Sequence, residues 1–215
     1  MRITVIDYGI GNILSVIRAL TYCGAEVLVT DSPDKIKSSR ALILPGVGAF
    51  EDGMRGLRNR NIIDSIKEFE RTGHPFMGIC LGMQMMLDVS EEFGIHKGLG
   101  LIPGKVARID HFTIEGEKQK TPHIGWNKLE LPLSNQISYW DNTILSGIDN
   151  QSEVYFVHSY TAIPDNNEHR LADAFYGGRQ ISAVIKKDNL YGCQFHPEKS
   201  GSIGLKIMAN FIQIC

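Results

Sequence analysis

The sequence lacks the features that mark membrane proteins, secreted proteins and nucleic-acid binders. No apolar run approaches the roughly 20 residues of a membrane-spanning helix. The first residues read as a strand rather than as a signal peptide. The 22 Lys and Arg are balanced by 24 Asp and Glu, so no strong positive charge is available to bind nucleic acid. These absences predict a cytoplasmic protein with no membrane or nucleic-acid partner.

The cysteines and glycines also lack the spacing of disulfide pairs, metal sites and dinucleotide-binding motifs. The four cysteines form no CxxC pair and have no zinc-type spacing, so we expect no disulfide and no metal. Gly9 and Gly11 lack the third glycine of a dinucleotide motif, because residue 14 is Leu, and we expect no cofactor. No repeat, low-complexity tract or linker interrupts the chain. Its 215 residues suffice for one core, so a single domain over 1–215 is expected.

Strand and helix patterns alternate in the first half of the chain. Buried β-branched runs are followed by apolar residues at helical spacing, and Pro33 opens a short helix. This alternation predicts an α/β fold with a doubly wound, largely parallel sheet. From residue 105 on, turns separate short strands, which predict antiparallel additions to that sheet. The additional strands are expected at 106–109, 126–131, 154–157, 171–175, 181–185 and 190–195, before a final helix at 206–214.

Cys80 lies in the stretch around which a site can be built. An apolar run ends at Gly78, Cys80 follows, and Gly82 precedes a helical pattern that continues through Leu87. A strand, a tight turn flanked by glycines and a helix are typical of a nucleophile elbow. A helix N-terminus would also favour the thiolate. By itself, the pattern leaves a buried structural cysteine equally open.

A nucleophilic cysteine needs a base and a third group that orients the base. His196 follows the expected strand 190–195 and stands two residues before Glu198. In an extended segment these two side chains project to the same side, so the carboxylate could raise the pKa of the imidazole. A solvated His-Pro-Glu turn is the alternative, and it would be favoured if the cysteine elbow were absent.

The glycine-rich segment 45–49 follows the strand expected at 41–44. It therefore lies at the same sheet edge as Cys80, where open α/β sheets place their sites. Its peptide N–H groups could bind an oxyanion, although an ordinary glycine turn is equally compatible. His158 suits a binding loop or a core position, and an exposed Trp126 would indicate an interface.

Three segments together resemble the signatures of class I (triad) glutamine amidotransferases. They are GICLGMQ at 78–84, PGVGAF at 45–50 and FHPEKS at 195–200. Within this family the chain is most similar to the glutaminase subunits of imidazole glycerol phosphate synthases, through DYGIGN at 7–12, PHIGWN at 122–127 and YFVHSY at 155–160. The resemblance runs from about residue 3 to the C-terminus, and residues 108–121 carry none of these signatures.

The resemblance implies that Cys80 attacks the side-chain amide of glutamine. His196 would act as base and then as acid, and Glu198 would orient its imidazole. The other implied residues form three groups: Val47, Gly48 and Leu81 for the oxyanion; Gln84, Glu92, Ser159 and Tyr160 for glutamine; Asn12, Trp126 and Lys199 for the partner interface.

The implied partner is a cyclase (β/α)8-barrel subunit in a heterodimer. It would use the ammonia to make imidazole glycerol phosphate and an aminoimidazole carboxamide ribotide in histidine biosynthesis. A paralogous subunit that supplies ammonia for an amidino sugar of surface polysaccharide would carry the same triad. Two further alternatives are a non-catalytic binding protein with a redox-sensitive Cys80, and a cysteine hydrolase of a related peptidase-like fold. The last of these leaves Gln84 and residues 122–127 without an obvious purpose.

Overall fold

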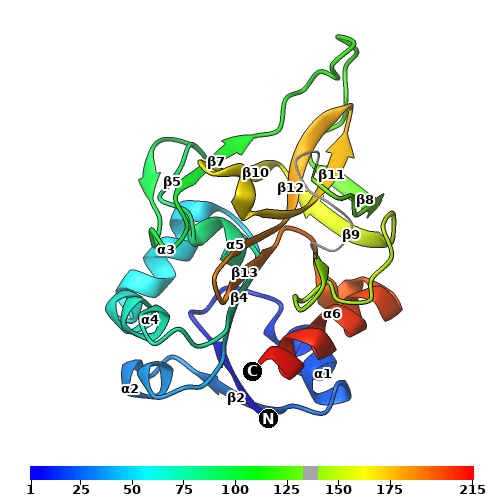
Figure 1. The fold of residues 1–215 in the computed structure, drawn as a ribbon. Helices are drawn as coiled ribbons and strands as arrows, with labels where there is room; N and C mark the ends of the chain where they lie inside the picture. The colour runs from blue at the N-terminus through cyan, green and yellow to red at the C-terminus, as the bar shows by residue number, and fades with distance from the viewer. Residues whose placement is uncertain (133–139) are drawn as a thin grey trace.

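A seven-stranded sheet forms the centre of the computed structural model, which describes residues 1–132 and 140–215 (Figure 1). The strand order is β11-β12-β13-β4-β3-β1-β2. The pairs from β2 to β13 are parallel, and β12 pairs antiparallel with both β13 and β11. The predicted largely parallel α/β fold is therefore confirmed. The strands of this sheet are β1 (Arg2–Ile6), β2 (Glu26–Thr30), β3 (Leu42–Gly46), β4 (Phe76–Cys80), β11 (Arg170–Tyr176), β12 (Arg179–Lys187) and β13 (Leu190–Cys193).

Helices cover both faces of the sheet because successive side chains of a strand point to opposite faces. Ile3 and Val5 of β1 belong to the core cluster that includes α1 and α6, whereas Ile6 belongs to the cluster that includes the other four helices. None of the helices in the described part of the chain is long and apolar enough to span a bilayer. The helices are α1 (Ile13–Tyr22), α2 (Pro33–Lys37), α3 (Phe50–Asn59), α4 (Ile63–Glu70), α5 (Leu81–Met85) and α6 (Gly201–Ile214).

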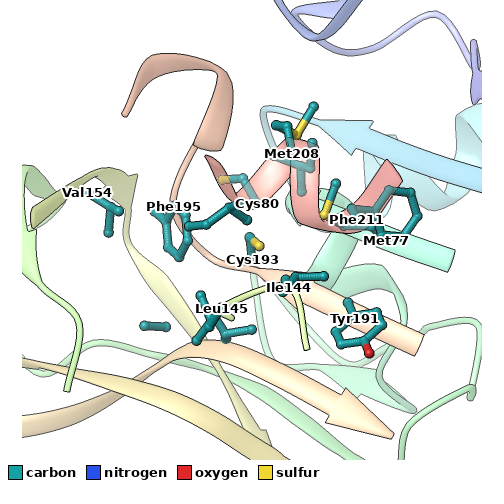
Figure 2. Close-up of a cluster of buried hydrophobic side chains, with 14 of the residues drawn as sticks. Met77, Cys80, Ile144, Leu145, Val154, Tyr191, Cys193, Phe195, Met208 and Phe211 are labelled. Carbon is teal, nitrogen blue, oxygen red and sulfur yellow. The ribbon is translucent and has the colours of Figure 1, made fainter. Parts of the chain in front are cut away.

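The core on the α1 and α6 side reaches the end of β4. Figure 2 shows Met77 and Cys193 of the sheet in the same buried cluster as Met208 and Phe211 of α6. Cys80 belongs to the same cluster and is only 7% exposed. The backbone that carries Cys80 is therefore held by a packed core, while its sulfur lies at the rim.

The strands between α5 and β11 form two smaller sheets, which corrects the expectation that they extend the first one. Strand β11 is the outer strand on this side and pairs with β12. Among the described residues between α5 and β11, Glu130 alone forms a β-bridge to it, with Asp173. The intervening strands therefore pair with one another. The four-stranded sheet has the order β10-β7-β5-β6, with β10 (Tyr160–Pro164), β7 (Gly104–Arg108), β5 (Val89–Ser90) and β6 (His96–Lys97), and β8 (His123–Lys128) pairs with β9 (Glu153–His158).

Helix α3 and strand β10 were not predicted, and α6 begins five residues earlier than the predicted 206–214. Glycines conceal α3 in the sequence, since glycine lowers helix propensity. Gly56 is required by packing, because a Cβ there would lie 2.8 Å from the backbone carbonyl oxygen of Tyr8, whereas the nearest atom to a Cβ on Gly53 is the movable Sδ of Met85. Residues 109–121 form an arm above β11 and β12 (Figure 1), where the Ile114 N–H donates to the Gly177 carbonyl.

Candidate active site

Cys80 occupies the turn between β4 and α5, as the elbow pattern predicts. Its φ of 52° and ψ of −108° lie in a region that residues with a Cβ rarely adopt. Gly82 permits the close packing of α5, because a Cβ there would lie 1.8 Å from the Leu44 carbonyl oxygen. Helix α5 ends at Met85, earlier than the predicted Leu87. With only five residues, it contributes little dipole to a thiolate.

His196 and Glu198 are in contact, and both side chains are almost completely buried. The imidazole Nδ1 lies 2.8 Å from Glu198 Oε1, and the side chains are 2% and 1% exposed. The extended geometry assumed for this pair is wrong, since Pro197–Lys199 forms a 3-10 turn. The turn brings Glu198 back to Nδ1, and the backbone N–H of His196 donates to the Tyr155 carbonyl at 3.0 Å. Because Glu198 occupies Nδ1, the other ring nitrogen, Nε2, is available to Cys80.

The pKa of His196 is raised from 6.5 to about 9. Burial lowers this pKa, but hydrogen bonding and charge interactions with Cys80 and Glu198 outweigh that effect. The imidazolium therefore persists at neutral pH, beside a sulfur that can carry the opposite charge. This arrangement suits a thiolate–imidazolium pair that attacks a carbonyl carbon.

A cavity of about 380 Å³ opens onto this pair. It brings together most of the predicted residues, whereas Glu198 lies behind His196, and Asn12 and Trp126 are not part of the lining. A larger cavity, about 560 Å³, lies by β1 and β2 and holds none of the candidates. The lining residues are Val47, Gly48, Cys80, Leu81, Gln84, Glu92, Pro122, Val157, His158, Ser159, Tyr160, His196 and Lys199.

The predicted oxyanion segment lies beside Cys80. Gly46 pairs with Cys80 in the β3–β4 register, and Gly48 has a φ of +98° with open space where a Cβ would stand. The Tyr8 hydroxyl donates to the Pro45 carbonyl at 2.7 Å and anchors the start of the segment. Burial, and then the charge of Cys80, raise the pKa of Tyr8. Tyr8 lies in the segment 7–12 of the family resemblance, but no role in the site was predicted for it.

Gln84 has only part of its amide available to a ligand. Its two amide protons point at the Tyr160 carbonyl, 2.9 Å away, and at Gln194 Oε1, 3.2 Å away. The carbonyl oxygen of Gln84 is therefore the group left for a substrate N–H. Gln194 itself, which is fully buried, was missed because one glutamine after a strand carries no periodic or motif signal.

Glu92 and Tyr160 each have a structural role as well as a place in the cavity. Glu92 Oε2 accepts from the Phe50 N–H at 2.6 Å and so caps α3, and its pKa is raised chiefly by burial. Tyr160 begins β10, so Ser159 and Tyr160 lie at the junction of β9 and β10. The Tyr160 carbonyl also accepts from His158 Nδ1 at 2.8 Å.

The three predicted interface residues lie around one face next to the cavity. Trp126 is 55% exposed. Its ring lies 3.9 Å from the place where a Cβ on Gly201 would stand, and Gly201 follows the exposed Lys199 by two residues. Asn12 immediately precedes α1, which packs beside the Pro197–Lys199 turn. No cluster of three or more metal-ligating side chains occurs within residues 1–132 and 140–215.

Removing the carboxylate of Glu198 should shift the pH profile of the glutamine hydrolysis that the sequence predicts. Activity in the wild type should fall as pH rises through about 9, because the raised pKa keeps the imidazolium that protonates the leaving group. Glu198→Gln should move this alkaline limb to lower pH and reduce kcat by about 10²- to 10⁴-fold. The profiles are measured between about pH 5.5 and 10.5.

The matched control is Glu26→Gln, which removes a glutamate from an exposed ion pair with Arg2. Its profile should coincide with that of the wild type. An alkaline limb that stays at the same pH in Glu198→Gln would show that Glu198 does not set the pKa of the His196 imidazole.

Comparison with known proteins places the chain in a family. The profile of the class-I glutamine amidotransferase family matches residues 4–214. The chain belongs to this family. It is 55% identical to imidazole glycerol phosphate synthase subunit HisH 1 of Legionella pneumophila (strain Lens), over 99% of both chains. It is 43% identical to subunit HisH of Geobacillus sp. (strain WCH70), over 99% of this chain and 96% of that one.

Solved structures agree with the fold. A glutamine amidotransferase crystal structure superposes with a TM-score of 0.72 at 16% identity, over 98% of this chain and 97% of that one. PurLQS from Thermotoga maritima gives a TM-score of 0.72 at 18% identity, over 99% and 97%. At these identities, the likeness establishes the shared architecture.

Proposed function

We propose that this chain is the glutaminase subunit of an imidazole glycerol phosphate synthase and works in the cytoplasm. The observation that carries the proposal is that Cys80 and His196 line one cavity together with Gly48 and Gln84, while Glu198 holds the far nitrogen of His196. Glutamine is the substrate, and glutamate and ammonia are the products. The family and the HisH relatives support the same reaction.

In the first half of the reaction, the Cys80 thiolate attacks the side-chain carbonyl carbon of glutamine. The tetrahedral oxyanion accepts hydrogen bonds from the backbone at Val47–Gly48 and from the Leu81 N–H. The His196 imidazolium donates its Nε2 proton to the nitrogen, the C–N bond breaks, and ammonia leaves a glutamyl thioester on Cys80. Glu198 keeps Nδ1–H bonded throughout, so that Nε2 always faces the reacting atoms.

In the second half, His196 acts as a base. It takes a proton from water, the hydroxide attacks the thioester carbonyl, and the collapse of the intermediate expels the Cys80 thiolate and releases glutamate. The imidazolium formed in this step restores the starting ion pair. Gln84 Oε1, Glu92, Ser159 and Tyr160 line the part of the cavity that would hold the rest of the substrate.

The ammonia is consumed by a partner, a (β/α)8-barrel cyclase subunit, in the formation of imidazole glycerol phosphate and aminoimidazole carboxamide ribotide. The relatives described above are named as subunits of that synthase. The face around Trp126, Asn12 and Lys199 is the docking surface in this proposal. The polysaccharide paralogue is not favoured, because the same relatives carry the synthase name.

An electrophilic glutamine analogue tests the proposal directly. It should modify one site, Cys80, as identified by peptide mass spectrometry, and glutamate release should stop in proportion. Adding the cognate barrel subunit and its nucleotide ligand should couple glutamate release to product formation. Modification elsewhere, or unimpaired glutaminase in the labelled protein, would support a binding protein instead. Cleavage of unstructured peptides would support the hydrolase alternative.

A further inference from the structure

We propose that Gln194 is a further catalytic residue, whose side-chain amide donates a hydrogen bond to the thiolate of Cys80. This inference rests on the proposed function. Gln194 directly follows β13 in the sequence, and its side chain is fully buried. Its backbone N–H donates to the Ala183 carbonyl at 2.9 Å. Its Nε2 lies 3.8 Å from Cys80 Sγ, within hydrogen-bonding range for sulfur.

The surroundings of the sulfur show why such a donor matters. The Val157 carbonyl oxygen lies 4.0 Å from Sγ, where it can accept from a thiol but opposes the negative charge of a thiolate. His196, with Glu198 behind it, and Tyr8 interact electrostatically with Cys80. Glu92, His158, Tyr160 and Lys199 line the same cavity. His196 gives up its proton to ammonia during the cycle. The uncharged amide of Gln194 keeps its donor in every step, including the one in which the thioester expels the thiolate.

Gln84 orients the amide of Gln194. Gln194 Oε1 accepts from Gln84 Nε2 at 3.2 Å, and Gln84 Nε2 also donates to the Tyr160 carbonyl at 2.9 Å. If the Gln194 amide flipped, its NH₂ group would face the NH₂ group of Gln84, and its oxygen would face the thiolate. Both contacts are repulsive, so Nε2 stays on the sulfur side. Gln84 is therefore a positioning residue for Gln194.

The acceptor that holds Gln84 is itself fixed by two histidines. His158 Nδ1 donates to the Tyr160 carbonyl at 2.8 Å, and His158 Nε2 lies 3.2 Å from His123 Nδ1. Burial lowers the pKa of His158 to about 3 and that of His123 to about 4, so both rings are neutral at pH 7. Asn127 of β8 completes the series by donating to His123 Nε2 at 3.3 Å. Hydrogen bonds thus run from the catalytic sulfur to the strand that carries Trp126.

The ionisation of Cys80 provides the test. Gln194→Met keeps the length of the side chain and removes the donor, and Gln194→Glu places a carboxylate beside the sulfur. The rate of Cys80 alkylation by iodoacetamide is followed against pH by peptide mass spectrometry. The midpoint should move up by about one pH unit in Gln194→Met and further in Gln194→Glu, with kcat about 10-fold lower and KM within about 2-fold.

Gln180→Met is the matched control, because that amide donates to the Asp173 carboxylate instead. Its alkylation midpoint should not move. If the Gln194 variants fail to fold, the side-chain amide signal of Gln194 in the wild type should titrate at the alkylation midpoint of Cys80 in an NMR experiment. An unmoved midpoint in folded Gln194→Met, or an amide signal that does not titrate, overturns the assignment. Glutaminase activity in Cys80→Ala would instead overturn the proposed function itself.

Discussion

Cys80→Ala should lower the kcat for glutamine hydrolysis by at least about 10⁴-fold while the protein stays folded. The thiolate forms the thioester bond, so the remaining donors and the cavity can bind glutamine but cannot open the acyl-enzyme route. Glutamate release is measured in the presence of the barrel subunit, and folding is followed by thermal denaturation. Turnover within about 10-fold of the wild type would exclude a cysteine nucleophile.

The backbone at position 80 adds a second readout. Alanine keeps a Cβ at the φ of 52°, whereas glycine adopts this region without strain. Cys80→Gly should therefore be as inactive as Cys80→Ala but more stable than it by about 1 kcal/mol. Cys23→Ala is the control for cysteine loss. Cys23 caps α1 and donates to the Leu205 carbonyl, outside the cavity, so this variant should keep its kcat.

Gly82→Ala should destabilise the protein by about 3 kcal/mol and reduce kcat by about 10²-fold or more. The added methyl group would lie 1.8 Å from the Leu44 carbonyl oxygen and 2.8 Å from its carbonyl carbon. Because both are backbone atoms of β3, the clash cannot be relieved by a side-chain rotation. Helix α5 must move away from the strand, and with it the Leu81 N–H and the turn that holds Cys80.

Gly24→Ala separates this clash from the general cost of replacing glycine. Gly24 has a φ of +88° but open space around its Cβ position. The Gly24→Ala variant should therefore lose only about 1 kcal/mol of the free energy of unfolding and keep full activity. Chemical denaturation gives the free energies of unfolding, and glutamate release gives kcat. A Gly82→Ala protein with wild-type stability would show that the contact between α5 and β3 is looser than described.

Structural features that depend on residues close together in the sequence were predicted well. The alternation of strands and helices indicated the parallel sheet, and the spacing of Gly78, Cys80 and Gly82 indicated the elbow. Both depend on periodicity or on turn chemistry within a few residues. Helix α3 was not predicted because its glycines lower helix propensity, and Gly56 is there for a close contact with the backbone of Tyr8, which is remote in sequence. The same limit explains why strands 104–108 and 160–164 were not seen to form a second sheet.

The residue types of the candidate site follow from the sequence alone: a cysteine at a glycine-flanked turn, a histidine followed two residues later by a glutamate, and a glycine segment at the end of a strand. Their chemistry is a property of the side chains and needs no coordinates. Tertiary structure decided how they act together. The Pro197–Lys199 turn, rather than an extended segment, joins Glu198 to His196, and packing places Gln194 against Cys80. Such contacts join residues far apart in the chain, and only the packing of the strands that carry them sets their distances.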